Sequence, residues 1–263
     1  MSPKKTEKEE EKAPQPEKKK ETTAEFISSM AVVLVTGLFI ITFCMQAFEI
    51  PSGSMIKTLL IGDHLFVDRA LLAPKTNWMP LVPYQQLHHR DIVVFVSPAQ
   101  PGLYLVKRVI GLPGDRIHLR DGVVYLNGQA QNEPYKFEDP DPAGGLRSYA
   151  LNFPSVPPDD SVTLTQEWHL TLSSHIEGDD LVVPPDSYFA MGDNRENSWD
   201  SRFWGFIPKE NLIGRPMFIY WSFETPADQY MKQDMGDRIG FIFHIVIHFF
   251  DQTRWSRLFR LVR

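Results

Sequence analysis

The chain has 263 residues, 43% of them apolar, which is enough for one large or two modest domains with a hydrophobic core. Its formal net charge of −6 argues against a nucleic-acid-binding protein, because such proteins carry a basic surface. Cys44 is the only cysteine, so the sequence excludes an intramolecular disulfide and a cysteine metal cluster but leaves the redox compartment open.

The first 25 residues are rich in Lys and Glu and nearly lack apolar side chains. A segment of this composition cannot offset its ordering entropy by burial, so we predict that 1–25 is a disordered, charged tail. A solvated tail without a specific partner is favoured over an interaction arm.

An uncharged run of 23 residues follows at 26–48. It is long enough to cross a bilayer as a helix, which takes about 20 apolar residues. A cleavable signal peptide would have a shorter apolar region of about 7 to 15 residues. A buried core helix would show a polar face, which this run lacks. The sequence therefore predicts one transmembrane helix at 26–48.

The basic residues near this run are on its N-terminal side, at Lys18, Lys19 and Lys20, whereas the other side has no basic residue before Lys57. The positive-inside rule then predicts a cytoplasmic N-terminus and an extracytoplasmic body from about residue 50. In a bacterium, this describes a single-pass protein of the inner (cytoplasmic) membrane whose body faces the periplasm or the outer surface.

Segments 49–128 and 179–225 have the residue pattern of strands. Short apolar and β-branched runs alternate with Gly, Pro, Asn and Asp turns, which favours antiparallel pairing. The predicted strands lie at 63–67, 91–96, 103–110, 123–126, 181–183, 188–191 and 217–221. The predicted fold class is mainly β: an antiparallel β-sheet body with a small inserted lobe, one N-terminal transmembrane helix and a short C-terminal amphipathic helix.

The inserted lobe is predicted at 129–178, where prolines and acidic residues accumulate and alternation is weak. This composition indicates a subsidiary lobe without a strong core of its own.

The C-terminal segment 226–263 is apolar and basic. Trp255, Leu258, Phe259 and Val262 recur at helical spacing between arginines, which predicts a short amphipathic helix. Such a helix suits a membrane interface, but packing against the protein's own β body is equally consistent with the pattern. His244 and His248 are spaced as metal ligands on a helix could be, but no third ligand is nearby, so we predict no metal site.

The sequence Pro-Ser-Gly-Ser-Met at 51–55 directly follows the predicted span. Two serines around a glycine at this place indicate a nucleophile held at the membrane surface. Ser54 would then act on a substrate that is in the membrane or emerging from it.

A serine hydroxyl needs a base to become nucleophilic at neutral pH. Histidine could serve, but His64, His88, His89 and His118 have no recognisable triad context. Lys107 lies in an apolar strand, where desolvation would lower its pKa and let it accept a proton. The alternative is an ordinary exposed lysine on the polar face of a half-buried strand.

Three motif blocks occur in order behind the predicted span. They are Pro-Ser-Gly-Ser-Met at 51–55, Lys-Arg-Val-Ile-Gly-Leu-Pro-Gly-Asp at 107–115 and Gly-Asp-Asn-Arg-Glu-Asn-Ser-Trp-Asp-Ser-Arg at 192–202. Together they resemble the main motifs of bacterial type I signal peptidases (leader peptidases), which are serine proteases with a Ser/Lys dyad. Gly-Asp at 62–63 and Gly-Phe-Ile-Pro at 205–208 extend the resemblance, which covers the anchor and most of 50–222.

The resemblance implies that Ser54 is the acylating nucleophile and Lys107 the general base. It places the oxyanion hole at the Ser54 backbone N–H and the Ser52 hydroxyl. Ser198 would hydrogen-bond the Lys107 amine and orient it.

The same resemblance implies that Asp193 pairs with Arg195, and Asp200 with Arg202, to brace the site. It further implies an endopeptidase that cleaves signal peptides from exported precursors after a small-x-small sequence through an acyl-enzyme. The expected partners are secretory preproteins and membrane lipid, with no nucleic acid, metal or organic cofactor.

The sequence departs from the family pattern in three respects. It has one obvious span where Gram-negative members often have two, Trp199 stands where a small residue is expected, and the insert at 129–178 has no match. Two other functions stay open: a Ser/Lys peptidase with another role, such as a pilin processor or a self-cleaving repressor, and a membrane-anchored β-domain that binds without catalysis. The span and the lack of a DNA-binding region disfavour the repressor, and the presence of both Ser54 and Lys107 disfavours the binding domain.

Overall fold

A computed structural model describes residues 22–70, 85–138, 148–160, 162–232 and 234–263. The disordered tail was predicted at 1–25, and residues 1–21 of it lie outside the described part. The chain divides into two compact units, Met1–Ile40 and Ile41–Arg263, and each is described by itself.

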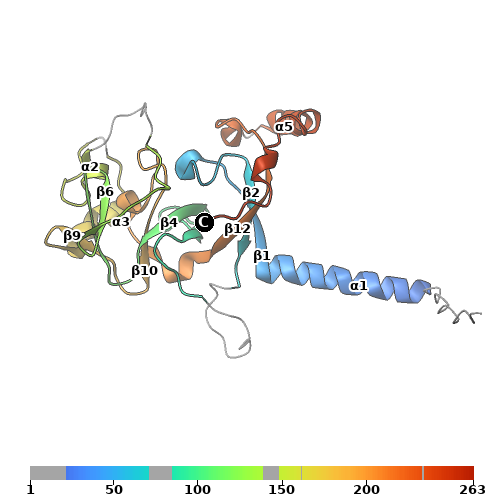
Figure 1. The fold of residues 1–263 in the computed structure, drawn as a ribbon, viewed down its shortest axis with the longest axis horizontal. Coiled ribbons are helices and arrows are strands. Elements are labelled where there is room, and N and C mark those ends of the chain that lie inside the picture. The colour runs from blue at the N-terminus through green and yellow to red at the C-terminus, as the bar shows by residue number, and fades with distance from the viewer. Residues whose placement is uncertain (1–21, 71–84, 139–147, 161, 233) are drawn as a thin grey trace, which may run out of the picture. The chain divides into compact units, whose positions relative to one another are not determined.

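The N-terminal unit contains the helix α1, Thr23–Phe39 (Figure 1). Thr22 caps it through a capping box with Glu25, which satisfies backbone N–H groups at the helix start. A π-helical turn, Ile40–Cys44, continues it, and the 22 residues Thr23–Cys44 have a mean hydropathy of 2.4. At 1.5 Å per residue this helix is about 33 Å long, enough for a bilayer core.

The helix ends before the predicted limit of 48. Residues Met45–Glu49 form strand β1, which pairs with β2, Asp63–Asp68, in antiparallel register. Uncharged composition alone does not distinguish the end of a span from a strand. Here the inter-strand hydrogen bonds to β2 satisfy the backbone in place of helical ones.

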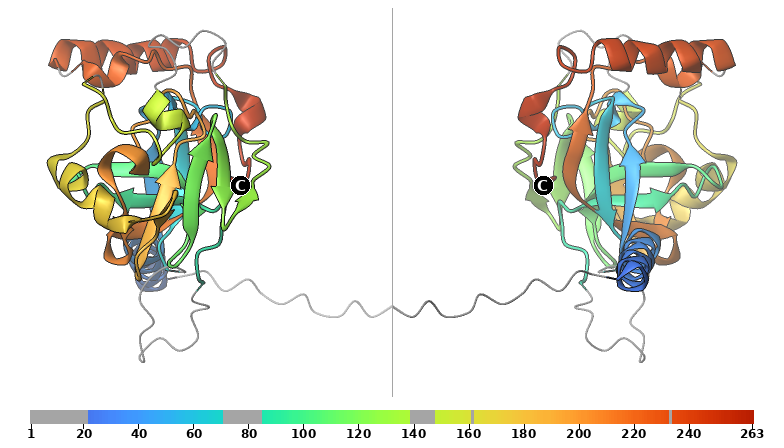
Figure 2. Two further views of the ribbon diagram at one scale, coloured as in Figure 1. Left: turned by 90° about the vertical axis from the view of Figure 1, so that its left-hand side faces the viewer. Right: turned by 90° about the vertical axis from the view of Figure 1, so that its right-hand side faces the viewer.

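The larger sheet has seven antiparallel strands in the order β1-β2-β12-β3-β4-β10-β11 (Figures 1 and 2). Its remaining strands are β3 (Ile92–Val96), β4 (Tyr104–Gly111), β10 (Ser187–Met191), β11 (Ile207–Pro208) and β12 (Leu212–Ser222). The mainly β, antiparallel prediction is confirmed. β12 begins five residues before the predicted strand at 217–221, because pairing continues past Gly214 and Pro216 with register shifts at both places.

A second sheet of five strands has the order β7-β6-β5-β9-β8. The strands are β5 (Arg116–Arg120), β6 (Val123–Leu126), β7 (Gln129–Ala130), β8 (Ile176–Glu177) and β9 (Asp180–Val182). Residues on both sides of the predicted boundary at 128 thus contribute to one sheet, and this sheet lies in the same compact unit as the larger one.

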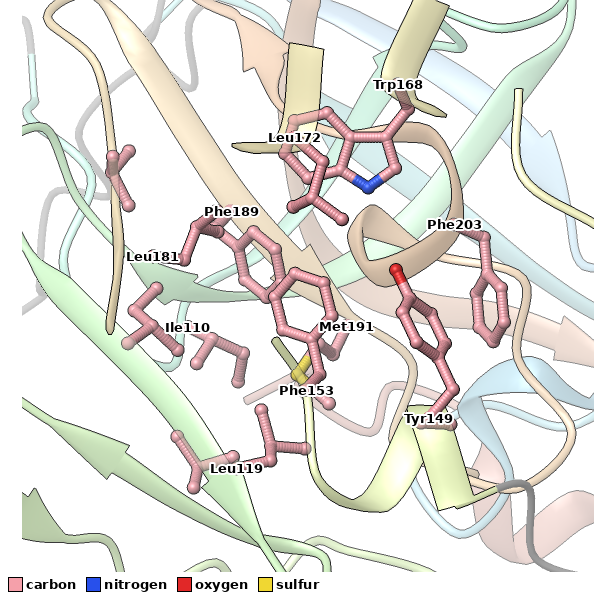
Figure 3. Packing of buried hydrophobic residues seen from close by; sticks show 14 residues of the cluster. Ile110, Leu119, Tyr149, Phe153, Trp168, Leu172, Leu181, Phe189, Met191 and Phe203 are labelled. Carbon is pink, nitrogen blue, oxygen red and sulfur yellow. The ribbon is translucent and has the colours of Figure 1, made fainter. Parts of the chain in front are cut away.

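The segment 129–178 contributes side chains to a core that it shares with strands outside the segment. Its short helices α2 (Ser148–Leu151) and α3 (Gln166–Thr171) bring Tyr149 and Trp168 into a cluster with Phe153 and Phe189 (Figure 3). These side chains are at most 3% exposed. The aromatic residues of 129–178 in this cluster lie on short helices and a loop with no repeated spacing, so periodicity could not reveal them.

The C-terminal helix is α5, Met235–Ile247, and α4, Ser201–Trp204, is a single turn near the site. The prediction of an amphipathic helix around Trp255 to Val262 was wrong in position. Only a 3-10 turn, Trp255–Arg257, forms there, and the chain then runs beside β12, where Phe259 donates to the Ile219 carbonyl. Of the two predicted placements, this last segment therefore shows packing against the β body.

Candidate active site

Ser54 and Lys107 are brought together by the packing of a turn against a strand. Ser54 lies in the 3-10 turn Gly53–Met55, just after β1, and Lys107 lies in the middle of β4. The Lys107 Nζ atom is 2.7 Å from the Ser54 Oγ atom. Residues that are far apart in the sequence thus form a hydrogen-bonded pair of a hydroxyl and an amine, the arrangement that a serine nucleophile with a lysine base requires.

The Lys107 side chain is not the exposed lysine of the alternative interpretation, because the residue is only 3% exposed. Burial is the main cause that lowers the pKa of Lys107 from 10.5 to about 8. The Asp200 carboxylate opposes this shift. Arg202 lowers the pKa further and Asp193 raises it, both by less. At pH 7 a pKa of 8 leaves about a tenth of the amines neutral, whereas the ordinary value would leave fewer than about one in a thousand. The site therefore holds a usable fraction of neutral base.

The oxyanion-hole candidate Ser52 lies beside Ser54. Its Oγ atom is 3.5 Å from the Ser54 Oγ atom, and its backbone is extended just before the turn. The turn itself is held by Asn194, which sequence reasoning missed. The Asn194 backbone N–H donates to the Ser54 carbonyl at 3.0 Å, and its side-chain amide donates to the Gly53 carbonyl at 3.3 Å.

The predicted pair of Asp200 and Arg202 is present and buried. Arg202 donates from Nε and Nη2 to the two carboxylate oxygens at 2.9 and 2.8 Å. Burial alone would raise the pKa of Asp200, but the Arg202 guanidinium, and to a smaller extent the Lys107 amine, hold this pKa below its usual value. This carboxylate therefore stays charged near Lys107.

The predicted pair of Asp193 and Arg195 is wrong. Asp193 accepts two 2.7 Å hydrogen bonds from Arg108, and Arg195 pairs with Glu133. Arg108 is the neighbour of Lys107 in β4, so alternation sends the two side chains to opposite faces of the strand. Proximity in the sequence suggested a local pair, but each side chain has a better-placed partner on another segment.

Ser198 lies close to the dyad without the predicted hydrogen bond to Lys107. Its Oγ atom is buried and has no hydrogen-bond partner. A Cβ atom on Gly192 would lie 2.3 Å from this Oγ and 2.5 Å from the Ser54 carbonyl oxygen. Glycine is therefore required where the turn that carries Ser198 meets the turn that carries Ser54.

The histidines that could have formed a triad have other partners. His118 contacts Asp180 at 2.6 Å, His89 contacts Asp115 at 2.6 Å, and His64 stacks on Trp221. Trp199, the unexpected residue of the third motif, is 37% exposed. Within the described ranges, the hydrogen-bonding neighbours of the Ser54 hydroxyl are Lys107 and Ser52.

The described residues include no group of three or more His, Cys, Asp or Glu side chains placed to hold a metal. His244, one of the two spaced histidines on α5, contacts Gln252 at 2.8 Å. His248 contacts Asp251 at 2.9 Å.

The chain is similar to known peptidases of one family. Residues 23–221 match the model of the family described as "Signal peptidase, peptidase S26". Signal peptidase I of Pseudomonas aeruginosa is 30% identical over 220 residues, which cover 77% of this chain and 74% of that protein. Signal peptidase I of Leptolyngbya laminosa is 31% identical over 204 residues, covering 75% and 79%.

A crystal structure of a signal peptidase I from Enterococcus faecalis matches 50% of this chain and 97% of that one at 30% sequence identity. Its TM-score of 0.33 is too low to support an argument about the fold. The family match covers most of the chain and includes all three motif blocks. The chain therefore belongs to the signal peptidase family, peptidase S26, whose members are serine endopeptidases.

Proposed function

We propose that this chain is a membrane-anchored signal peptidase that cleaves exported precursors after a small-x-small sequence, with Ser54 as nucleophile and Lys107 as general base. The observation that supports this most directly is the 2.7 Å contact between the Ser54 hydroxyl and a buried amine whose pKa is lowered to about 8. A lysine held exposed in salt bridges could not act as this base at neutral pH.

In the acylation step, the Ser54 Oγ–H proton passes to neutral Lys107 while Oγ bonds to the scissile carbonyl carbon. The tetrahedral oxyanion is held by the Ser54 backbone N–H and the Ser52 hydroxyl, a kind of interaction whose loss typically costs about 2.7–4 kcal/mol. The C–N bond then breaks, and Lys107 gives its proton to the amine of the departing mature protein. A water molecule, deprotonated by Lys107, hydrolyses the acyl-enzyme and releases the signal peptide.

The remaining assigned residues would position this pair. Ser198 would donate its unpaired hydroxyl to the Lys107 amine once the side chains adjust to substrate. The pairs Asp200–Arg202 and Asp193–Arg108 would brace the turn after β10 against β4.

The apolar helix supports anchoring in a bacterial inner membrane with the N-terminus in the cytoplasm and the body outside. The nucleophile follows the end of this apolar segment by ten residues, from Cys44 to Ser54, so substrates that leave the bilayer would meet it early. Preproteins with signal peptides would be the substrates, and lipid the surroundings of the helix.

The test is cleavage of a purified preprotein by the full chain in a neutral detergent. We expect Ser54→Ala and Lys107→Ala to lose cleavage by at least about 10³-fold, as residues of a catalytic unit do. Ser187→Ala, at a serine on β10 outside the site, is the matched control and should retain activity. Full cleavage by either dyad variant would refute the mechanism. A folded wild type that cleaves no Ala-x-Ala precursor would favour a binding domain without catalysis.

A further inference from the structure

A cavity of about 780 Å³ lies next to the strand that carries Lys107 but is lined by neither Ser54 nor Lys107. Its walls include Arg108, which leaves β4 on the face opposite to Lys107, and the β12 residues Pro216 and Ile219. All its lining residues belong to the compact unit Ile41–Arg263. The volume is in the range of small-ligand sites, about 300–1,000 Å³.

The cavity concentrates positive charge in a chain whose net charge is −6. Four exposed cations line it, Lys57, Arg90, Arg260 and Arg263. None of the four forms an ion pair with any residue that the structure describes. They come from three separate segments: the turn after Ser54, the loop before β3 and the C-terminal segment. Single exposed cations are ordinary, but four without a side-chain carboxylate partner around one hollow create a positive potential that attracts an anion.

The other two buried or half-buried cations of the cavity are already neutralised. Arg108 is paired with Asp193 at 2.7 Å, and Arg215 is paired with Asp91 at 2.6 Å. These pairs leave the side-chain charges of the four exposed cations uncompensated, so a ligand with a negative charge would complete the site.

Two of these cations also have unusual backbones. Lys57 has a φ of 75° and Arg90 a φ of 73°, a left-handed region that side chains with a Cβ rarely adopt. Such conformations persist only where the surroundings enforce them, and they are concentrated at functional sites. The backbone of Arg90 is enforced in part by Arg108, which donates to its carbonyl at 2.8 Å.

We propose that this cavity binds a phosphate ester that carries an apolar portion. A phosphate group has several oxygen acceptors pointing in different directions, so it can meet cations from three segments, whereas a carboxylate has two oxygens in one plane. The apolar part would rest on Ile219 and Leu261, which form part of the wall. Two sources supply such a phosphate, an anionic phospholipid and a soluble organic phosphate, and the experiment below distinguishes them.

The test uses the full chain in a neutral detergent, with glycerol 3-phosphate as the soluble probe in calorimetric titrations. Arg90→Gln/Arg260→Gln should weaken binding by about tenfold, the loss expected for two partly exposed charge contacts. The control Lys209→Gln/Lys232→Gln removes two exposed lysines outside the cavity and should change the affinity by less than about twofold. Thermal unfolding of both proteins checks that the folds are equivalent, and Arg260→Gln alone is the fallback if the double variant unfolds.

Native mass spectrometry of the same proteins with phosphatidylglycerol or phosphatidylcholine identifies the source. Phosphatidylglycerol adducts that decline in the cavity variant and not in the control identify a lipid ligand, while binding of glycerol 3-phosphate alone identifies a soluble one. The proposal is overturned if neither phosphate binds, if the two double variants behave alike, or if an Asp-rich peptide binds at this cavity while the phosphates do not.

Discussion

Lys107 combines burial with proximity to charged groups, and its pKa of about 8 makes the proposed reaction dependent on pH. We predict that kcat/KM rises with pH and levels off above an apparent pKa near 8, because only the neutral amine of the free enzyme accepts the Ser54 proton. A pH–rate profile on a peptide substrate without titrating groups measures this. A limb near the ordinary histidine pKa of about 6.5 that disappears in His64→Ala would instead indicate a histidine base.

The same burial should make Lys107 costly for stability. Its folded pKa lies below its unfolded value, so between pH 8 and about 10.5 the unfolded state binds more protons and the contribution of this group to the free energy of unfolding rises with pH. Below pH 8 the destabilisation is fully present. We therefore predict that Lys107→Met is inactive yet more stable than wild type at pH 7, by a few kcal/mol at most.

Denaturant unfolding at pH 7 and pH 9.5 gives the difference in free energy of unfolding between Lys107→Met and wild type. Ionisable groups that both proteins contain cancel in this difference. The advantage of Lys107→Met should shrink at the higher pH. An advantage that stays constant, or a less stable variant at pH 7, would contradict the inferred cost.

At the scale of elements, the site turn after β10 is tied to the segment after β7. Arg195 and Glu133 form a buried ion pair, with side chains 3% and 5% exposed, and Phe137 donates to the Asp193 carbonyl at 2.8 Å. Tyr135 lies under the Arg108 guanidinium, 4.0 Å from ring centroid to Cζ. The inserted segment thus contacts the turn after β10 and the Arg108 side chain of β4.

We predict that Glu133→Gln destabilises the protein by about 3–5 kcal/mol, because it leaves the Arg195 charge buried without its partner. The melting temperature should fall by roughly 10 °C, and kcat should fall with it because the turn that carries Ser198 loses its support. Glu167→Gln, at an exposed acidic residue on α3, is the control and should change neither quantity measurably. If the two variants have the same melting temperature and the same kcat, the inserted segment does not support the site.

At the scale of the whole molecule, the prediction concerns which side of the membrane each unit occupies. Cys44 is the only cysteine, so a Cys44→Ser background accepts single reporter cysteines. With the positive-inside orientation, a membrane-impermeant thiol reagent should label Ser173→Cys in intact spheroplasts and Ser2→Cys only after lysis. Labelling of Ser2→Cys in intact spheroplasts would reverse the orientation.

The features that can be predicted from the sequence are carried by contiguous residues. A long uncharged run predicts a span, short β-branched runs predict strands, and the motif blocks around Ser54 and Lys107 indicate the family. Each depends on the chemistry of neighbours in the chain, so it can be read without knowing the path of the backbone.

Which distant groups meet is seen only in the folded chain. Asp193 could have paired with its neighbour Arg195, but strand register brings Arg108 to it and the inserted segment brings Glu133 to Arg195. Contacts between distant segments also produce three other features: the burial of Lys107, the packing of 258–262 along β12 and the cationic cavity. The energy of such contacts depends on distance, solvent exposure and competing partners, and local sequence patterns do not specify these quantities.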